Sequence, residues 1–265
     1  IFGASGPVGQ AATAELRARG LHVATVGRSA RDFELNVLDH EQVSDFFDAH
    51  NVPRIVYLVR PDLGGAGAGT VGDAVRAFSL FVSAAGEGGL ERFVFASSAA
   101  VYGDQWSAPV REDDALAGES AYAIFKRESE SVLTDIARDC DFASTSLRIF
   151  NVYGPGCHGS LINKLRSGPP PDLMMTSSFV RDYIHSSDVA RLVYEATASD
   201  DICGPINVGT GVAIDNLRLA ELAGWGTFHP VSSNLQASYS VADTSKANAE
   251  LNFRARFDLA EFLRR

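Results

Sequence analysis

Short runs of apolar residues, bounded by turn-forming residues, recur along the chain. Such runs are typical of strands that are buried on both faces of a sheet. They predict strands at 23–26, 55–59, 93–96, 146–150 and 206–208. Stretches that can form helices lie at 8–19, 41–50, 71–85, 121–139 and 187–197. Strands that alternate with helices predict an α/β fold, with a doubly wound parallel sheet covered on both faces.

The regular alternation ends after residue 150. Turn-forming residues follow at Gly154-Pro155-Gly156, and Gly168 precedes three prolines. We therefore expect a core domain at 1–150 and a smaller, discontinuous C-terminal substrate lobe at 151–265, with 181–209 returning to the core. At the other end, Ile1 and Phe2 have the character of the last residues of a first strand, so we expect the native chain to extend upstream.

Composition narrows the range of partners. The chain has 265 residues with 33 acidic and 23 basic side chains, a formal charge of -10 and no basic block. This balance disfavours nucleic acid and anionic membranes as partners. Cys140, Cys157 and Cys203 show no metal-ligand spacing, so we expect a reducing, cytoplasmic setting and no metal site. No apolar run approaches the roughly 18 residues of a membrane span.

A glycine-rich turn lies between the end of the first predicted strand and the first predicted helix. Its sequence runs Gly3-Ala4-Ser5-Gly6-Pro7-Val8-Gly9. Glycines at this place permit a tight turn and let a pyrophosphate approach backbone N–H groups at the helix N-terminus. We therefore predict that Gly3, Ser5, Gly6, Pro7, Val8 and Gly9 bind a dinucleotide.

The end of the second predicted strand bears on the choice of cofactor. An acidic residue there would bind the ribose hydroxyls of NAD, whereas an arginine can accept the 2′-phosphate of NADP. The chain has Arg28 and Ser29 at this point and no acid. This favours NADP(H), with NAD(H) as the alternative if Arg28 is only a solvated turn residue.

A serine, a tyrosine and a lysine form the candidate catalytic set. Tyr122 and Lys126 are four residues apart on a predicted helix, so they share one face, where the ammonium can lower the pKa of the phenol. Ser98 ends a predicted strand, where α/β sheets place their ligands. Its hydroxyl can hold a substrate carbonyl while Tyr122 gives or takes a proton.

Together these features resemble the short-chain dehydrogenase/reductase superfamily, and the local strings are similar to those of its extended, nucleotide-sugar-modifying branch. The resemblance covers nearly the whole chain and implies a Rossmann domain that binds NAD(P) at 1–150. The matching strings are Ser97-Ser98-Ala-Ala-Val-Tyr-Gly103, Tyr122 to Lys126, Asn151-Val-Tyr-Gly-Pro-Gly156, Arg181-Asp-Tyr-Ile-His-Ser-Ser-Asp188 and Ala242-Asp243-Thr-Ser-Lys246-Ala247.

The resemblance implies further roles. Ser98, Tyr122 and Lys126 would form the catalytic triad, and Ser98, Ala99, Asn151 and Arg181 would contact the substrate, with Arg181 at its diphosphate. Further cofactor contacts would come from Asn36, Val37, Leu58, Val59, Arg60, Tyr122 and Lys126. This chain departs from the branch at two of these places. The branch usually has an aspartate where this chain has Asn36, and an alanine pair where it has Val59-Arg60.

Three of these roles have simpler alternatives. Asn151 can be a turn residue that caps its own backbone. Arg181 can form a salt bridge with Asp182 or Asp188. Arg60 either adds to phosphate binding or points outward.

The residues after Ser98 separate the possible reactions. Sugar 4,6-dehydratases of the branch have an Asp-Glu pair where this chain has Ala99 and Ala100, so dehydration is excluded. We expect an NADPH-dependent 4-ketoreductase acting on a nucleotide-diphosphate-linked keto-deoxyhexose. The alternatives are a nucleotide-sugar 4-epimerase with tightly bound NAD, a non-catalytic NADP-binding sensor, and a reductase of non-sugar carbonyls, which fits the later strings less well. The branch often dimerises, so a homodimer is also expected.

Overall fold

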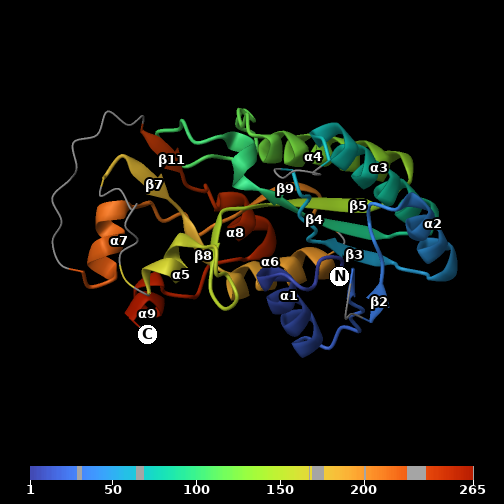
Figure 1. Cartoon of the computed structure of the whole chain (residues 1–265), viewed down its shortest axis with the longest axis horizontal. Coiled ribbons are helices and arrows are strands. Elements are labelled where there is room, and N and C mark those ends of the chain that lie inside the picture. Colours follow the sequence, from blue (N-terminus) through green and yellow to red (C-terminus); the bar gives the residue numbers. More distant parts are fainter. Residues whose placement is uncertain are drawn as a thin grey trace.

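The central apolar runs form a parallel sheet in a computed structural model of the chain (Figure 1). The structure describes residues 1–28, 32–63, 69–166, 168, 176–199, 201–225 and 237–264. Four strands pair in the order β3 (Arg54–Tyr57), β4 (Arg92–Ser98), β5 (Ala143–Ile149), β9 (Gly204–Val208). Phe2 bridges in parallel to both Val26 and Tyr57, which joins β1 (Val26–Gly27) and its parallel partner β2 (Phe33–Glu34) to this sheet.

Alternate side chains of each strand enter two different apolar clusters. Ile55 and Tyr57 face one cluster, and Val56 between them faces the other. The first cluster is covered by α2 (His40–Ala49), α3 (Val71–Glu87) and α4 (Ala121–Asp139). The second is covered by α1 (Pro7–Ala18), α6 (Ser186–Ala198) and α8 (Ser245–Leu251). The prediction of a doubly wound sheet is therefore confirmed.

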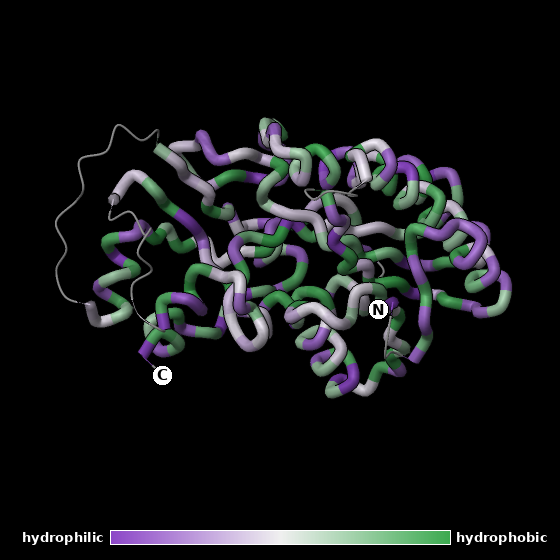
Figure 2. The backbone as a smooth tube through the Cα atoms, viewed as in Figure 1, coloured by the Kyte–Doolittle hydropathy of each residue, from purple (hydrophilic) through white to green (hydrophobic). Residues whose placement is uncertain are grey.

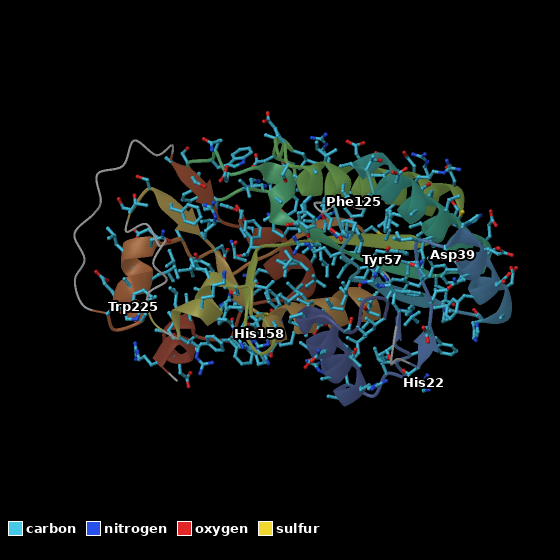
Figure 3. All side chains as sticks on the ribbon, viewed as in Figure 1. His22, Asp39, Tyr57, Phe125, His158 and Trp225 are labelled. Carbon is cyan, nitrogen blue, oxygen red and sulfur yellow. The ribbon has the colours of Figure 1, made fainter. Side chains whose placement is uncertain are left out.

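The covering helices have the sequence features that such a position requires. Hydrophilic and hydrophobic residues alternate along them (Figure 2). Side chains cap three of their first turns, since Asp39, Thr70 and Ser120 accept hydrogen bonds from backbone N–H groups of α2, α3 and α4. Tyr57 of the sheet and Phe125 of α4 both lie in the layer between them (Figure 3).

A second set of elements lies beside the carboxyl ends of the strands (Figure 1). Its strands are β6 (Asn151–Tyr153) paired in parallel with β8 (Tyr183–His185), and a sheet in the order β10 (Ile214–Asp215), β7 (Phe179–Arg181), β11 (Ser238–Ser240). Its helices are α5 (Leu161–Leu165), α7 (Asn216–Leu222) and α9 (Leu259–Arg264). A separate cluster that includes Ile162, Leu219 and Leu263 forms its core.

One buried carboxylate connects these elements. Asp182 is fully buried between β7 and β8, and it accepts hydrogen bonds from backbone N–H groups of Thr210, Gly211 and Ala242. It also accepts one from the Thr210 hydroxyl at 2.6 Å. A buried charge is tolerated when it is hydrogen-bonded in this way. Asp182 therefore holds together two loops that are distant in sequence.

The structure differs from the sequence-based expectation in the second half of the chain. Residues 151–153 were expected to begin a turn, but they form β6 because β8 supplies a parallel partner. Within the described ranges, no helix is both long enough and apolar enough to cross a membrane.

Candidate active site

The glycine-rich turn lies at the carboxyl edge of the sheet, and two of its glycines are required by the fold. Gly3 has a φ of 83°, and a Cβ there would lie 2.9 Å from the Leu58 carbonyl carbon and from the Val59 nitrogen. A Cβ on Gly9 would lie 2.4 Å from the Gly3 oxygen. Neither position accepts a side chain unless the backbone moves.

Gly6 is different, because the fold does not require a glycine there. Its φ is -70°, and the nearest atom to a Cβ would be the Gly3 oxygen at 3.9 Å. Gly6 is also the N-cap of α1, and no side chain of the described residues caps that helix. Pro7 has no N–H, but from Val8 onward the first turn of α1 presents uncapped backbone N–H groups beside open space, as a phosphate site requires. Ser5 is exposed next to it.

The end of β1 carries the predicted cofactor discriminator. Arg28 is exposed directly after the strand, and Ser29 lies outside the described residues. The nearby acid, Asp32, accepts hydrogen bonds from the Thr25 backbone N–H and hydroxyl and pairs with Arg17 at 3.3 Å. Arg17 lies in the last turn of α1, at the opposite end of that helix from Gly6, so the Asp32 carboxylate is directed away from the glycine-rich turn.

The other predicted cofactor contacts differ in their exposure and in their hydrogen bonding. The Asn36 side chain accepts a hydrogen bond from the Leu38 N–H at 3.2 Å, so it already caps a local turn. Three predicted contacts are half-buried against the apolar clusters: Val37, Leu58 and Val59. Arg60 is exposed.

Ser98, Tyr122 and Lys126 come together at the carboxyl end of β4. Ser98 is the last residue of the strand, and its Oγ accepts a hydrogen bond at 3.2 Å from the N–H of Ala100 in the 3-10 helix η1 (Ala99–Tyr102). Tyr122 lies in the first turn of α4, where the Ser98 hydroxyl is near enough to its phenol to lower the pKa of the phenol. The Lys126 Nζ lies 5.6 Å from the centre of the Tyr122 ring.

Burial shifts the pKa values of Lys126 and Tyr122. The Lys126 side chain is 2% exposed, its Nζ donates to the Ala96 carbonyl at 2.6 Å, and burial lowers its pKa to about 7 against the opposing charge of Glu130. Burial raises the pKa of Tyr122, whereas the Arg60 charge and the Ser98 hydrogen bond lower it. Lys126 was expected from the sequence to lower the pKa of Tyr122, and the structure places a second cation, Arg60, beside the same ring at 5.2 Å.

The four predicted substrate contacts line one pocket. This pocket has a volume of about 400 Å³ and adjoins a second pocket of about 550 Å³, which contains Tyr122 and Arg60 and shares Ser120 with the first. The predicted residues in the first pocket are Ser98, Ala99, Asn151 and Arg181. The predicted donor of the proton and the predicted substrate contacts therefore lie side by side.

The simpler alternatives for two of these residues are wrong. The Asn151 side chain does not cap its own backbone; its Nδ2 donates to the Asp182 carbonyl, across to the neighbouring segment, at 2.9 Å. Arg181 pairs with neither Asp182 nor Asp188. Its guanidinium pairs with Asp104 at 3.2 Å, because the chain after η1 passes beside β11, the neighbour of β7.

The polar partners of the site were not among the residues predicted from the sequence. Arg181 donates to Ser238 at 2.6 Å as well as to Asp104, and the Ser238 hydroxyl in turn donates to Asp104. The Ser238 hydrogen bond, with the Arg181 charge, holds the pKa of Asp104 below its usual value. Glu130 was missed too, although its position four residues after Lys126 on a predicted helix would have indicated it.

A larger pocket lies away from this chemistry. It has a volume of about 590 Å³, lies between the β10–α7 and α8–α9 segments, and contains none of the predicted site residues. The smaller pocket at Ser98 is the better candidate, since titratable and hydrogen-bonding groups converge there.

Known proteins are similar to this chain. The model of the NAD dependent epimerase/dehydratase family matches residues 1–209. The dTDP-4-dehydro-6-deoxyglucose reductase of Escherichia coli is 32% identical over 63% of this chain and 58% of the relative. The UDP-glucose 4-epimerase of Bacillus subtilis (strain 168) is 26% identical over 89% of this chain and 80% of the relative. The chain thus spans less than two thirds of the length of the reductase.

One solved structure shares both fold and sequence similarity with this chain. MoeE5 in complex with UDP-glucuronic acid and NAD has a TM-score of 0.82 at 26% identity. The alignment covers 99% of this chain and 95% of that one.

Proposed function

The chain belongs to the NAD dependent epimerase/dehydratase family, and from this membership we propose that it reduces the keto group of a nucleotide-linked deoxyhexose with NADPH. The observation that carries the proposal is the pocket at Ser98. It brings a hydroxyl at the strand end beside the phenol of Tyr122 and has alanine at positions 99 and 100. Such a site can polarise a carbonyl and deliver one proton, and it lacks the acid pair directly after the serine that the dehydratases of the branch use to eliminate water.

Each residue of the site has its own role in the proposed reaction. Ser98 holds the carbonyl oxygen of the substrate, and Tyr122 transfers its phenolic proton to that oxygen as the carbonyl carbon is reduced. The bound nicotinamide cofactor supplies the hydride that goes to the carbon. Arg181 and Asn151 hold the nucleotide-linked part of the substrate at the other end of the pocket.

The cofactor site fits a dinucleotide on the chain's own geometry. The uncapped first turn of α1 and the open space at Gly6 suit a pyrophosphate. Arg28 is exposed at the end of β1, where the 2′-phosphate of NADP would lie, and Asp32 is engaged elsewhere. These contacts support NADPH over NADH, although MoeE5 has NAD bound.

The test combines purified protein, NADPH or NADH, and a panel of nucleotide-linked 4-keto-6-deoxyhexoses. We expect substrate-dependent loss of NADPH absorbance, slower loss with NADH, and a single alcohol stereoisomer as product. Tyr122→Phe should reduce the rate by a factor of at least ~100, the range of general acid catalysis, while it retains cofactor binding. Full activity of Tyr122→Phe would refute the assignment.

A 4-epimerase is the second candidate, and the relatives favour it by number. UDP-glucose 4-epimerases of several organisms are similar to this chain at 25% to 28% identity. An epimerase would release NAD when denatured and would interconvert UDP-glucose and its 4-epimer without net consumption of cofactor. Binding of NADP without any turnover of the panel would point instead to a sensor.

A further inference from the structure

Arg60 stands beside the phenol of Tyr122. It follows β3 at the carboxyl edge of the sheet, and its guanidinium carbon lies 5.2 Å from the centre of the Tyr122 ring. Both side chains line the pocket that adjoins the Ser98 pocket. A cation at this distance from an aromatic ring is within the range of a cation–π contact.

The buried Lys126 supplies only part of a positive charge to Tyr122 at neutral pH, because part of the lysine population is unprotonated there. The Lys126 ammonium donates to the Ala96 carbonyl, and its pKa of about 7 means that it loses its proton in the neutral range. A guanidinium keeps its charge across the range in which a buried lysine loses its proton. Arg60 is therefore the cation that acts on Tyr122 independently of pH.

Two acidic side chains lie near Tyr122 as well. Asp62 lies on the same loop as Arg60 and lines the same pocket, and Glu119 precedes α4 and lines the Ser98 pocket. Both are negative and oppose ionisation of a nearby phenol. The charge of Arg60 favours this ionisation.

We propose that Arg60 is a positioning residue for Tyr122, whose permanent charge strengthens the phenol as the proton donor of the reaction. The proposal rests on the role of Tyr122 in the proposed function and adds a fourth residue to Ser98, Tyr122 and Lys126. It also gives a reason for an arginine at the end of β3, where the resemblance leads one to expect a small residue.

The first test needs no substrate. The phenolate absorbance of the apo protein is followed through an alkaline titration, and the titration of a Tyr122→Phe variant is subtracted, which isolates Tyr122 from the other tyrosines. The same subtraction is made between Arg60→Gln and the double variant Arg60→Gln/Tyr122→Phe. We expect the midpoint of Tyr122 to rise by on the order of one pH unit in Arg60→Gln. Arg60→Lys should restore most of the original midpoint.

A matched control separates a local effect from a change in net charge. Arg138 is exposed in the last turn of α4, far along the helix from Tyr122, so Arg138→Gln removes the same charge at a distance. It should leave the midpoint unchanged. An unchanged midpoint in Arg60→Gln, or equal rises in Arg60→Gln and Arg138→Gln, would overturn the proposal.

The second test uses the reaction. In the direction of reduction Tyr122 must be protonated, so kcat/KM falls as pH rises through its pKa. Arg60→Gln should move this fall to higher pH by the same shift as in the titration and lower the plateau below it. If the midpoint shifts and no keto sugar reacts, the proposed function fails while the effect of Arg60 on Tyr122 stands.

Discussion

At the residue scale, the arginine of the pocket at Ser98 already has partners. Arg181 lies 3.7 Å over the Phe179 ring and pairs with Asp104, and the same carboxylate accepts from Ser238. The Asp104 side chain is 45% exposed, so it can turn away from Arg181. A diphosphate that enters the pocket has to compete with this carboxylate for the guanidinium.

Asp104→Asn tests this competition. The amide keeps the shape of the side chain and loses the negative charge, so we expect a nucleoside diphosphate to bind about threefold to tenfold more tightly. Calorimetric titration with UDP and dTDP measures the change. Asp113→Asn, on the same connecting segment but paired with Arg111, is the control and should have no effect. Weaker binding by Asp104→Asn would mean that Asp104 orients Arg181 instead of competing for its ligand.

The site residues differ in how far sequence could identify them. Ser98, Tyr122 and Lys126 were identifiable because each occupies a fixed place on a strand end or one helix face. Asp104 is 77 residues from Arg181, and no local pattern connects the two. Its contact depends on how the segment after η1 passes beside β11, which is a property of the tertiary structure.

At the scale of elements, two glycines of the turn before α1 have different roles. The fold requires Gly9, whereas Gly6 leaves space for a ligand. Gly6→Ala should leave thermal stability almost unchanged, because a Cβ has 3.9 Å of room there. It should weaken NADPH binding by about tenfold or more, since the methyl group would occupy the space of a pyrophosphate. Fluorescence titration with NADPH and thermal unfolding give the two measurements.

Gly9→Ala is the contrasting variant. Its Cβ would meet the Gly3 oxygen at 2.4 Å, so the backbone must shift and the protein should lose stability as well as cofactor binding. Normal NADPH affinity in a folded Gly6→Ala protein would argue against this turn as the phosphate site.

The elements themselves were predictable where their contacts are local. Helix α4 has the predicted bounds, because Ser120 caps it and its apolar face repeats with helical spacing. The short strands β6, β7 and β11 were missed. Each has three residues, and their partners lie far away in the sequence, as in the pairing of Asn151 with Tyr183.

At the scale of the whole molecule, the buried Lys126 reduces stability. Its folded pKa of about 7 lies below its unfolded value of 10.5, so between these values the unfolded chain binds the extra proton. The free energy of unfolding therefore rises with pH over this range, by about 1.4 kcal/mol per pH unit from this group. Below about pH 7 the full destabilisation is present.

Lys126→Met should remove both the destabilisation caused by the buried lysine and its dependence on pH. We expect the apo variant to be more stable than the parent protein at neutral pH, with a flatter dependence between about pH 7 and about pH 9. Urea unfolding across this range measures the difference. Lys164→Met, at an exposed position on α5, serves as the control. If the variant is less stable than the parent protein at neutral pH, the buried lysine does not destabilise the folded state.

The contacts of Asp182 also bear on how the chain matures during synthesis. The carboxylate takes its backbone partners from Thr210, Gly211 and Ala242, and Ser240 forms part of the wall of the Ser98 pocket. A nascent chain can pair β3, β4 and β5 before those residues leave the ribosome. The pocket at Ser98, however, is complete only after residue 242 has emerged, so its walls form after the central strands have been able to pair.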